Sequence, residues 1–318
     1  MQYKKKVTVL SVICAALALV YILTFVFDYE SGFGRGRNAA FSLLDPSLLY
    51  LMDKIEIYQG GNNAGTKTVL SRKNNIWVFS AETGDHPVKQ GRVEDFLNQL
   101  TRKEPYTLRA SSSEARERLG LLDDGASRIV VRGGAGLPLL DLLIGTGDAL
   151  GREVYLRRTG ENEIYSAEDR ITVYVDSKPN SWYDLRLFPP DAAAAMVQQA
   201  DITLPGSNEA YTLRRRGEGW IIPADESAAL DSLRVEAWLR SVLEAEAEDF
   251  ASRSPQAIEG SISLRLGDGT TRSIQTGPAD EQNRRSAVVS VSALEYVLSE
   301  WTLNRLFREK EYFFAAAQ

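Results

Sequence analysis

The only histidine is the first residue to consider for chemistry. His86 follows Asp85 in the sequence Gly84-Asp85-His86-Pro87, and Cys14 is the only cysteine. Zinc sites need several nitrogen or sulfur ligands, which one histidine cannot supply. A serine–histidine–aspartate triad on His86, and hence a hydrolase, stays open as an alternative, although no Gly-x-Ser-x-Gly nucleophile elbow accompanies it. We predict that His86 is a residue of a turn.

A glycine-rich run and two groups of acidic residues are the other candidates. The run GTGDALG at 145–151 is one residue longer than the dinucleotide-binding motif, and a strand-like segment follows it where a phosphate site needs a helix. Asp123-Asp124 and the acids of 244–249 lack the ligand spacing of a calcium loop. The sequence therefore predicts no catalytic residue, no cofactor and no metal, and it favours a non-enzymatic protein.

Aromatic residues at repeated positions form the strongest pattern. In each half a tryptophan-bearing strand precedes an amphipathic helix, whose apolar residues recur every three or four positions. Each half then closes on Trp-x-x-x-Arg-Leu-Phe. Matched positions favour core packing over a sugar or lipid cleft. The signature residues, which we interpret as structural, are Trp77, Trp182, Arg186 and Phe188 in the first half and Trp220, Trp301, Arg305 and Phe307 in the second.

These repeats predict how the elements are organised. We expect an internal duplication with a junction at Pro189-Pro190, which gives one module over residues 45–189 and a second over 190–314. Helices and strands are mixed within each module. The predicted fold class is α+β: an N-terminal transmembrane helix followed by two tandem, duplicated α+β modules with largely antiparallel sheets.

The transmembrane helix is predicted from residues 7–27. These 21 residues carry no charge, and as a helix they would span about 30 Å, the thickness of a bilayer core. Lys4, Lys5 and Lys6 precede them and place the N-terminus in the cytoplasm. Residues 1–30 are then a cytoplasmic tip and signal anchor, and 31–44 are a linker. A cleaved signal peptide is the alternative. The predicted localisation is the inner membrane, single-pass, with the bulk of the chain periplasmic or extracellular.

Composition narrows the class of partner. The chain is 44% hydrophobic, which suffices for a globular core, and its net charge is −6. An acidic chain repels phosphate backbones, so we predict no binding of nucleic acid. A single cysteine allows no internal disulfide.

The tryptophan hairpins, their Val-Glu-x-Phe/Trp-Leu helices and the closing motif resemble the bacterial family catalogued as domain of unknown function 4340, over most of residues 40–310. The family often closes on Trp-Arg-Asp, where this chain has Trp182-Tyr183-Asp184 and Trp301-Thr302-Leu303. The resemblance transfers no catalytic residue. It implies an extracytoplasmic auxiliary component of a gliding-motility-type ABC exporter, with the permease and ATPase as partners.

We therefore expect a non-enzymatic, membrane-anchored accessory or scaffold subunit of an envelope ABC-type transport complex, in contact with the lipid bilayer through residues 7–27. The alternative is a tethered solute- or lipid-binding protein with a cleft between the two modules, because pockets often form at domain junctions.

Overall fold

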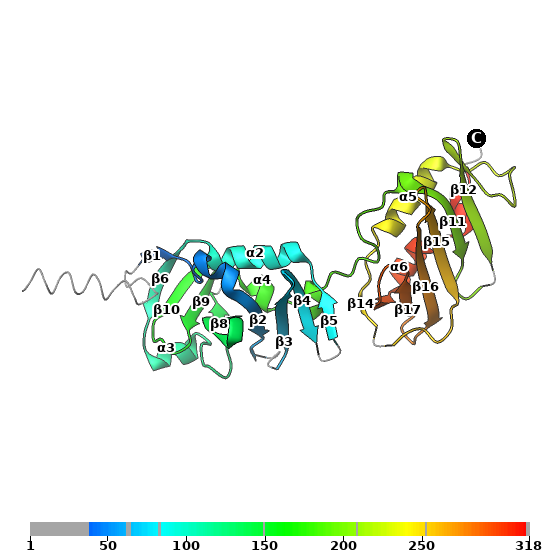
Figure 1. Ribbon diagram of the computed structural model, residues 1–318. Coiled ribbons are helices and arrows are strands. Elements are labelled where there is room, and N and C mark those ends of the chain that lie inside the picture. The colour runs from blue at the N-terminus through cyan, green and yellow to red at the C-terminus, as the bar shows by residue number, and fades with distance from the viewer. Residues whose placement is uncertain are drawn as a thin grey trace, which may run out of the picture. The chain divides into compact units, whose positions relative to one another are not determined.

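The chain folds as two compact units, residues 1–182 and 183–318 (Figure 1). The computed structural model describes residues 38–315 except 62–64, 82–83, 149, 208 and 252. The predicted junction at Pro189-Pro190 lies inside the second unit. Each unit is built on one antiparallel sheet.

The first unit has a ten-stranded sheet in the order β1-β6-β10-β9-β8-β7-β2-β3-β4-β5. Its helices are α2 (Gln90–Thr101), α3 (Ser113–Arg118) and α4 (Thr172–Val175), with 3-10 turns at Pro46–Leu51, Gly134–Gly136 and Pro179–Trp182. Its strands are β1 (Asn38–Phe41), β2 (Met52–Tyr58), β3 (Lys67–Lys73), β4 (Ile76–Ala81), β5 (Gly84–Pro87), β6 (Glu104–Ala110), β7 (Ser127–Gly133), β8 (Pro138–Gly147), β9 (Glu153–Arg158) and β10 (Ile164–Glu168).

Helices cover both faces of this sheet. Helix α2 buries Val93, Phe96 and Leu100, which the 3.6-residue period places on one side. Helix α3 packs elsewhere, because its Ala115 joins a cluster with Leu143. Successive strand residues point to opposite faces, so Leu143 faces away from its buried neighbour Leu142. Figure 1 shows α2 and α3 on opposite sides of the sheet.

The second unit has an eight-stranded sheet in the order β13-β12-β11-β15-β16-β17-β18-β14. Its helices are α5 (Ser232–Leu243) and α6 (Glu300–Leu306), with 3-10 turns at Ala194–Met196 and Lys310–Phe313. Its strands are β11 (Val197–Thr203), β12 (Ala210–Arg216), β13 (Gly219–Ile221), β14 (Asp249–Phe250), β15 (Gly260–Leu266), β16 (Thr271–Ala279), β17 (Arg285–Val289) and β18 (Glu295–Leu298).

The two sheets have the same strand order. In the first unit the inner eight strands run β6-β10-β9-β8-β7-β2-β3-β4, and the second sheet repeats this order from β14 to β13. Helix α2 lies between β5 and β6 along the chain, as α5 lies between β13 and β14. Strands β1 and β5 and helix α3 are additions of the first unit. The shared order is what an internally duplicated chain produces.

The structure corrects the predicted fold class from α+β to mostly β, with two antiparallel sheets. The sequence predicts a helix for the alanine-rich run 192–199, which follows Pro190-Asp191, but this run forms one 3-10 turn and the start of β11. Residues 292–300, also predicted as helix, contain β18. Both segments pair with strands already in the sheet, and this pairing outweighs their intrinsic helix propensity.

The structure also corrects the predicted localisation. Within residues 38–315 no helix is long and apolar enough to cross a bilayer, and residues 7–27 lie outside the described residues. The longest described helices, α2 and α5, have 12 residues each. Such a helix is about 18 Å long, whereas a span needs about 20 residues.

Candidate functional site

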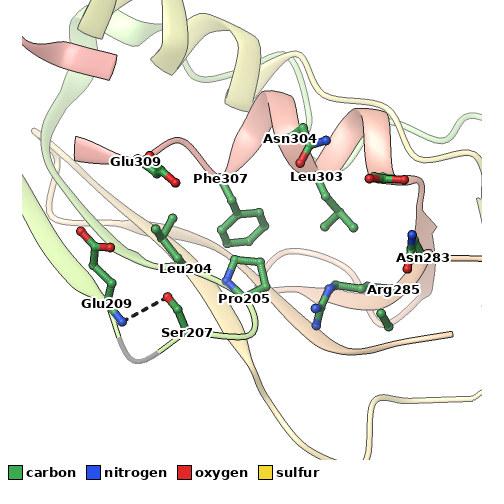
Figure 2. Close-up of a pocket in the computed structure, with 12 residues that line it drawn as sticks. Leu204, Pro205, Ser207, Glu209, Asn283, Arg285, Leu303, Asn304, Phe307 and Glu309 are labelled. Carbon is green, nitrogen blue, oxygen red and sulfur yellow. Dashed lines mark hydrogen bonds between the residues drawn. The ribbon is translucent and has the colours of Figure 1, made fainter. Parts of the chain in front are cut away.

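A groove beside helix α6 is a candidate site of the second unit. It has a volume of about 460 Å³. Three segments that are far apart in the sequence meet there: the β11–β12 connection, the residues around the start of β17, and α6 with the turn that follows it (Figure 2). The lining residues are Leu204, Pro205, Ser207, Glu209, Ala279, Asn283, Arg285, Glu300, Leu303, Asn304, Phe307 and Glu309.

The groove has an apolar floor. Figure 2 shows Phe307 between Leu204, Pro205 and Leu303, which extend toward one another from opposite walls. Ser207 closes the loop on one wall, because its hydroxyl oxygen accepts a hydrogen bond of 3.2 Å from the backbone N–H of Glu209. Such a floor can bury apolar groups of a bound molecule.

The rim of the groove is acidic. Glu209, Glu300 and Glu309 are exposed, and among the described residues none of the three forms a salt bridge. Arg285 is the one cation in the lining, and it is already engaged. Its guanidinium donates to the Glu259 carboxylate at 2.7 Å and to the Gly277 carbonyl oxygen at 2.6 Å. The groove therefore presents net negative charge to a ligand.

Trp301 is exposed on the helix that lines the groove. It follows Glu300 directly and is 68% exposed, while the Arg305 guanidinium lies 4.7 Å from the centre of its ring. Residues three apart are neighbours on a helix surface, so Trp301 adjoins the lining residue Asn304. A cation over an indole face restrains both side chains. The pair forms an ordered aromatic surface beside the groove.

The start of α6 is fixed by a capping network. The Ser299 hydroxyl accepts a hydrogen bond of 3.2 Å from the backbone N–H of Thr302. Glu248 accepts from the backbone N–H of Ser299 at 2.7 Å and from the Thr302 hydroxyl at 2.7 Å. A helix start is stabilised when its free N–H groups find acceptors. The network therefore holds Trp301 in place at the first turn.

The structure places the two closing tryptophans in unlike positions. Trp182 is fully buried and ends the first unit, whereas Trp301 is exposed on α6. The structural counterpart of Trp182 is Phe313. The Trp182 carbonyl accepts from the backbone N–H of Lys89, the N-cap of α2, at 2.9 Å, and Phe313 accepts from Asp231, the N-cap of α5, at 2.8 Å.

The ring contacts confirm this correspondence. Trp182 packs edge-on against Phe96 of α2 at 5.7 Å and 79°, and Phe313 packs edge-on against Trp238 of α5 at 5.2 Å and 76°. The two ring pairs thus have the same geometry. The tryptophan lies in the closing turn of the first unit but on helix α5 in the second, and the phenylalanine takes the other position in each unit. Trp301 has no part in this geometry, so core packing does not explain why it is a tryptophan.

The remaining signature residues lie mostly in the cores. Trp77 and Trp220 occupy the same register position, each opposite an arginine of the preceding strand, and both are buried. Phe188 is buried in the second unit, and Arg186 donates to Asp184 at 2.8 Å. Only Trp301, Arg305 and Phe307 come together, on α6 and directly after it.

The other candidates from the sequence do not assemble into a reactive site. His86 lies on strand β5, opposite Phe79 of β4, so the prediction that it is a residue of a turn is wrong. The glycine-rich run spans the end of β8 and the hairpin into β9. In the described part of the chain, no three His, Cys, Asp or Glu side chains are grouped so that they could hold a metal ion.

Two sheets with one strand order and one closing contact define the class: a mostly β protein with two tandem antiparallel sheets. The chain belongs to the DUF4340 family, whose model, described as a domain of unknown function, matches residues 77–261, from β4 in the first unit to β15 in the second. No curated protein and no solved structure matches the chain.

Proposed function

We propose that the protein is a non-enzymatic accessory or scaffold subunit, which binds a partner protein at the groove and the adjoining Trp301–Arg305 surface. The observation that best supports this proposal is the exposure of Trp301. A tryptophan that is 68% exposed contributes little to the core, while tryptophan and arginine dominate the binding energy of protein interfaces.

The groove complements the aromatic surface. Its apolar floor can take up a side chain of the partner, and its three carboxylates favour a segment that carries lysine or arginine. Interfaces commonly combine a buried apolar centre with a polar rim. The permease and ATPase of an ABC-type exporter are the first partners to test, because the family resemblance implies them.

Co-purification tests the proposal. The tagged full-length chain is purified from its native host, and the proteins bound to it are identified and quantified. We expect near-stoichiometric recovery of the exporter subunits with the native chain. Trp301→Ala removes the exposed ring and should reduce recovery at least about tenfold, in line with the loss of one interface hot spot. Glu209→Lys should weaken binding because it reverses a charge on the rim.

Leu233→Ala is the matched control. Leu233 is 82% exposed on α5 and does not line the groove. It should leave recovery unchanged. If Trp301→Ala and Leu233→Ala behave alike, or if the native chain is recovered alone, the proposal is wrong. The alternative of a ligand cleft between the modules stays a prediction from the sequence.

A further inference from the structure

The first unit carries a group of cations around one nearly buried carboxylate. Glu56 on β2 is only 6% exposed at its side chain. It forms salt bridges of 3.0 Å with Lys54, 2.9 Å with Lys67 and 3.0 Å with Arg132. Three cations from three neighbouring strands therefore meet at one acid.

A second ion pair extends this group along the same face. Arg128 lies opposite Tyr58 of β2, and it contacts Asp141 at 2.7 and 2.5 Å through two guanidinium nitrogens. We call the set of Lys54, Glu56, Lys67, Arg128, Arg132 and Asp141 the cationic sheet face. It holds four cations and two carboxylates, so its net charge is positive although the chain as a whole carries −6.

The second unit shows that the fold does not require the two lysines that contact Glu56. Asp201 of β11 occupies the register position of Glu56, since it lies between Thr212 and Ser263 as Glu56 lies between Val69 and Val130. Asp201 accepts hydrogen bonds from two neutral groups, the Gln199 amide at 2.9 Å and the Thr212 hydroxyl at 2.7 Å. An acid at this position is thus satisfied without any cation.

The two lysines differ between the units, whereas Arg132 has a counterpart in Arg265, which lies opposite Gln199 as Arg132 lies opposite Lys54. Gln199 stands at the position of Lys54, and Ala210 at that of Lys67, because Lys67 is opposite Tyr58 as Ala210 is opposite Thr203. In the first unit, three cations therefore surround one carboxylate, although hydrogen bonds from neutral groups satisfy the corresponding acid of the second unit.

The cations are accessible and keep unused donors. The side chains of Lys54, Lys67 and Arg132 are 41%, 39% and 37% exposed. Arg132 contacts Glu56 through its Nε, and a guanidinium has further N–H groups in a fork that matches a carboxylate. A second carboxylate can therefore bind these groups from the solvent side.

We propose that the cationic sheet face binds an acidic segment of a partner protein through its aspartate or glutamate side chains. The small cluster matches a few carboxylates on a short segment. A nucleic acid needs an extended run of phosphate contacts, and the negative net charge of the chain opposes it. This site is independent of the groove, which is acidic and belongs to the other unit.

Fluorescence anisotropy tests the proposal. It measures the binding of a labelled oligoglutamate peptide to the full-length chain at low and at physiological salt. The test variant is Lys54→Gln with Lys67→Ala, which introduces the residue types of the second unit and leaves Arg132 to pair with Glu56. The control is Arg214→Gln with Arg265→Gln. It removes two positive charges beside Gln199 in the second unit. Circular dichroism checks that both variants fold.

We expect salt-sensitive binding that weakens about fivefold or more in the test variant and less than twofold in the control. Trp301→Ala should leave it unchanged, which separates this proposal from the proposed function. Equal losses in test and control variants, or no binding of the peptide, would overturn the proposal. Binding of an oligothymidylate of matched charge in place of the peptide, with the same dependence on Lys54 and Lys67, would overturn it in favour of nucleic acid.

Discussion

Replacing Trp182 and Trp238 by phenylalanine, one at a time, makes the same chemical change at two buried indoles that differ in one hydrogen bond. The two side chains are 0% and 2% exposed. The Trp238 indole N–H donates to the Leu306 carbonyl oxygen at 2.8 Å, whereas the buried Trp182 indole N–H has no acceptor among the described residues.

The free energies of unfolding should therefore change differently. Loss of ring volume costs about 1–2 kcal/mol at either site. At Trp238 the substitution also leaves the Leu306 carbonyl unpaired, which adds about 1–3 kcal/mol. At Trp182 it removes an unpaired donor, and the relief offsets the loss of volume. We expect Trp238→Phe to cost at least about 2 kcal/mol more than Trp182→Phe.

Urea unfolding followed by far-ultraviolet circular dichroism measures this difference, because the signal does not depend on the fluorescence of the substituted residues. Trp182 lies in the first unit and Trp238 in the second, so each change should shift the transition of its own unit. If Trp182→Phe destabilises its unit as much as Trp238→Phe destabilises the other, the reasoning from the unpaired indole is refuted.

Three further predictions concern the site, a pH dependence and a close backbone approach. Trp301→Ala should change the free energy of unfolding by less than about 0.5 kcal/mol in the same assay, because the exposed ring contributes little to the core. Burial raises the pKa of Glu56, but hydrogen bonds from Lys67, Lys54 and Arg132 outweigh it and lower the pKa from 4.5 to about 2. A lowered pKa stabilises the fold above the unfolded value, so the first unit should lose up to about 3 kcal/mol as pH falls from about 4.5 to 2, and Glu56→Gln should remove that dependence in a pH series of unfolding curves. Gly145→Ala should cost at least about 2 kcal/mol in thermal or urea unfolding, because the new Cβ would collide with the Leu119 carbonyl oxygen; unchanged stability would contradict the close approach.

Periodic patterns in the sequence correctly predicted the two amphipathic helices and the two tryptophan hairpins. The spacing of Val93, Phe96 and Leu100 gave helix α2 with these residues buried, and the same spacing gave α5. The tryptophan hairpins became β3–β4 and β12–β13. Such periodicities report which face of an element is buried, and this requires no knowledge of its neighbours.

The sequence pattern treats Trp182 and Trp301 as equivalent positions of the two halves, and the structure shows that they are not. The motif Trp-x-x-x-Arg-Leu-Phe is helical around Trp301, where Arg305 lies one turn later beneath the ring. Around Trp182 the same letters leave one unit and enter the next, so that Phe188 packs in a different core. Identical spacing therefore occurred in two backbone conformations. The structural counterpart of Trp182 is Phe313, and because the two residues differ in type, the sequence does not show that they correspond.

The two proposed binding surfaces depend on contacts that the sequence alone does not show. Alternation in Lys54-Ile55-Glu56-Ile57 indicates that Lys54 and Glu56 share a face. The arrival of Lys67 and Arg132 at the same carboxylate depends on strand register, which no short window encodes. The groove could not be predicted from a short window either, because three segments that are far apart in the sequence form its walls. The exposure of Trp301 beside it is likewise a property of the structure, because the sequence pattern favoured a buried position.

The edges of the two sheets limit how this protein can associate. In the second unit the outermost strands, β13 and β14, have only three and two residues, and in the first unit β1 and β5 have four each. Pro87 ends β5 and cannot donate a backbone hydrogen bond. Short edges of this kind give another chain little backbone to pair with, which guards against aggregation and against recognition by strand addition. Specificity must then be carried by side chains, so single substitutions on the sheet surface and on α6 are the changes through which binding can be altered without loss of the fold.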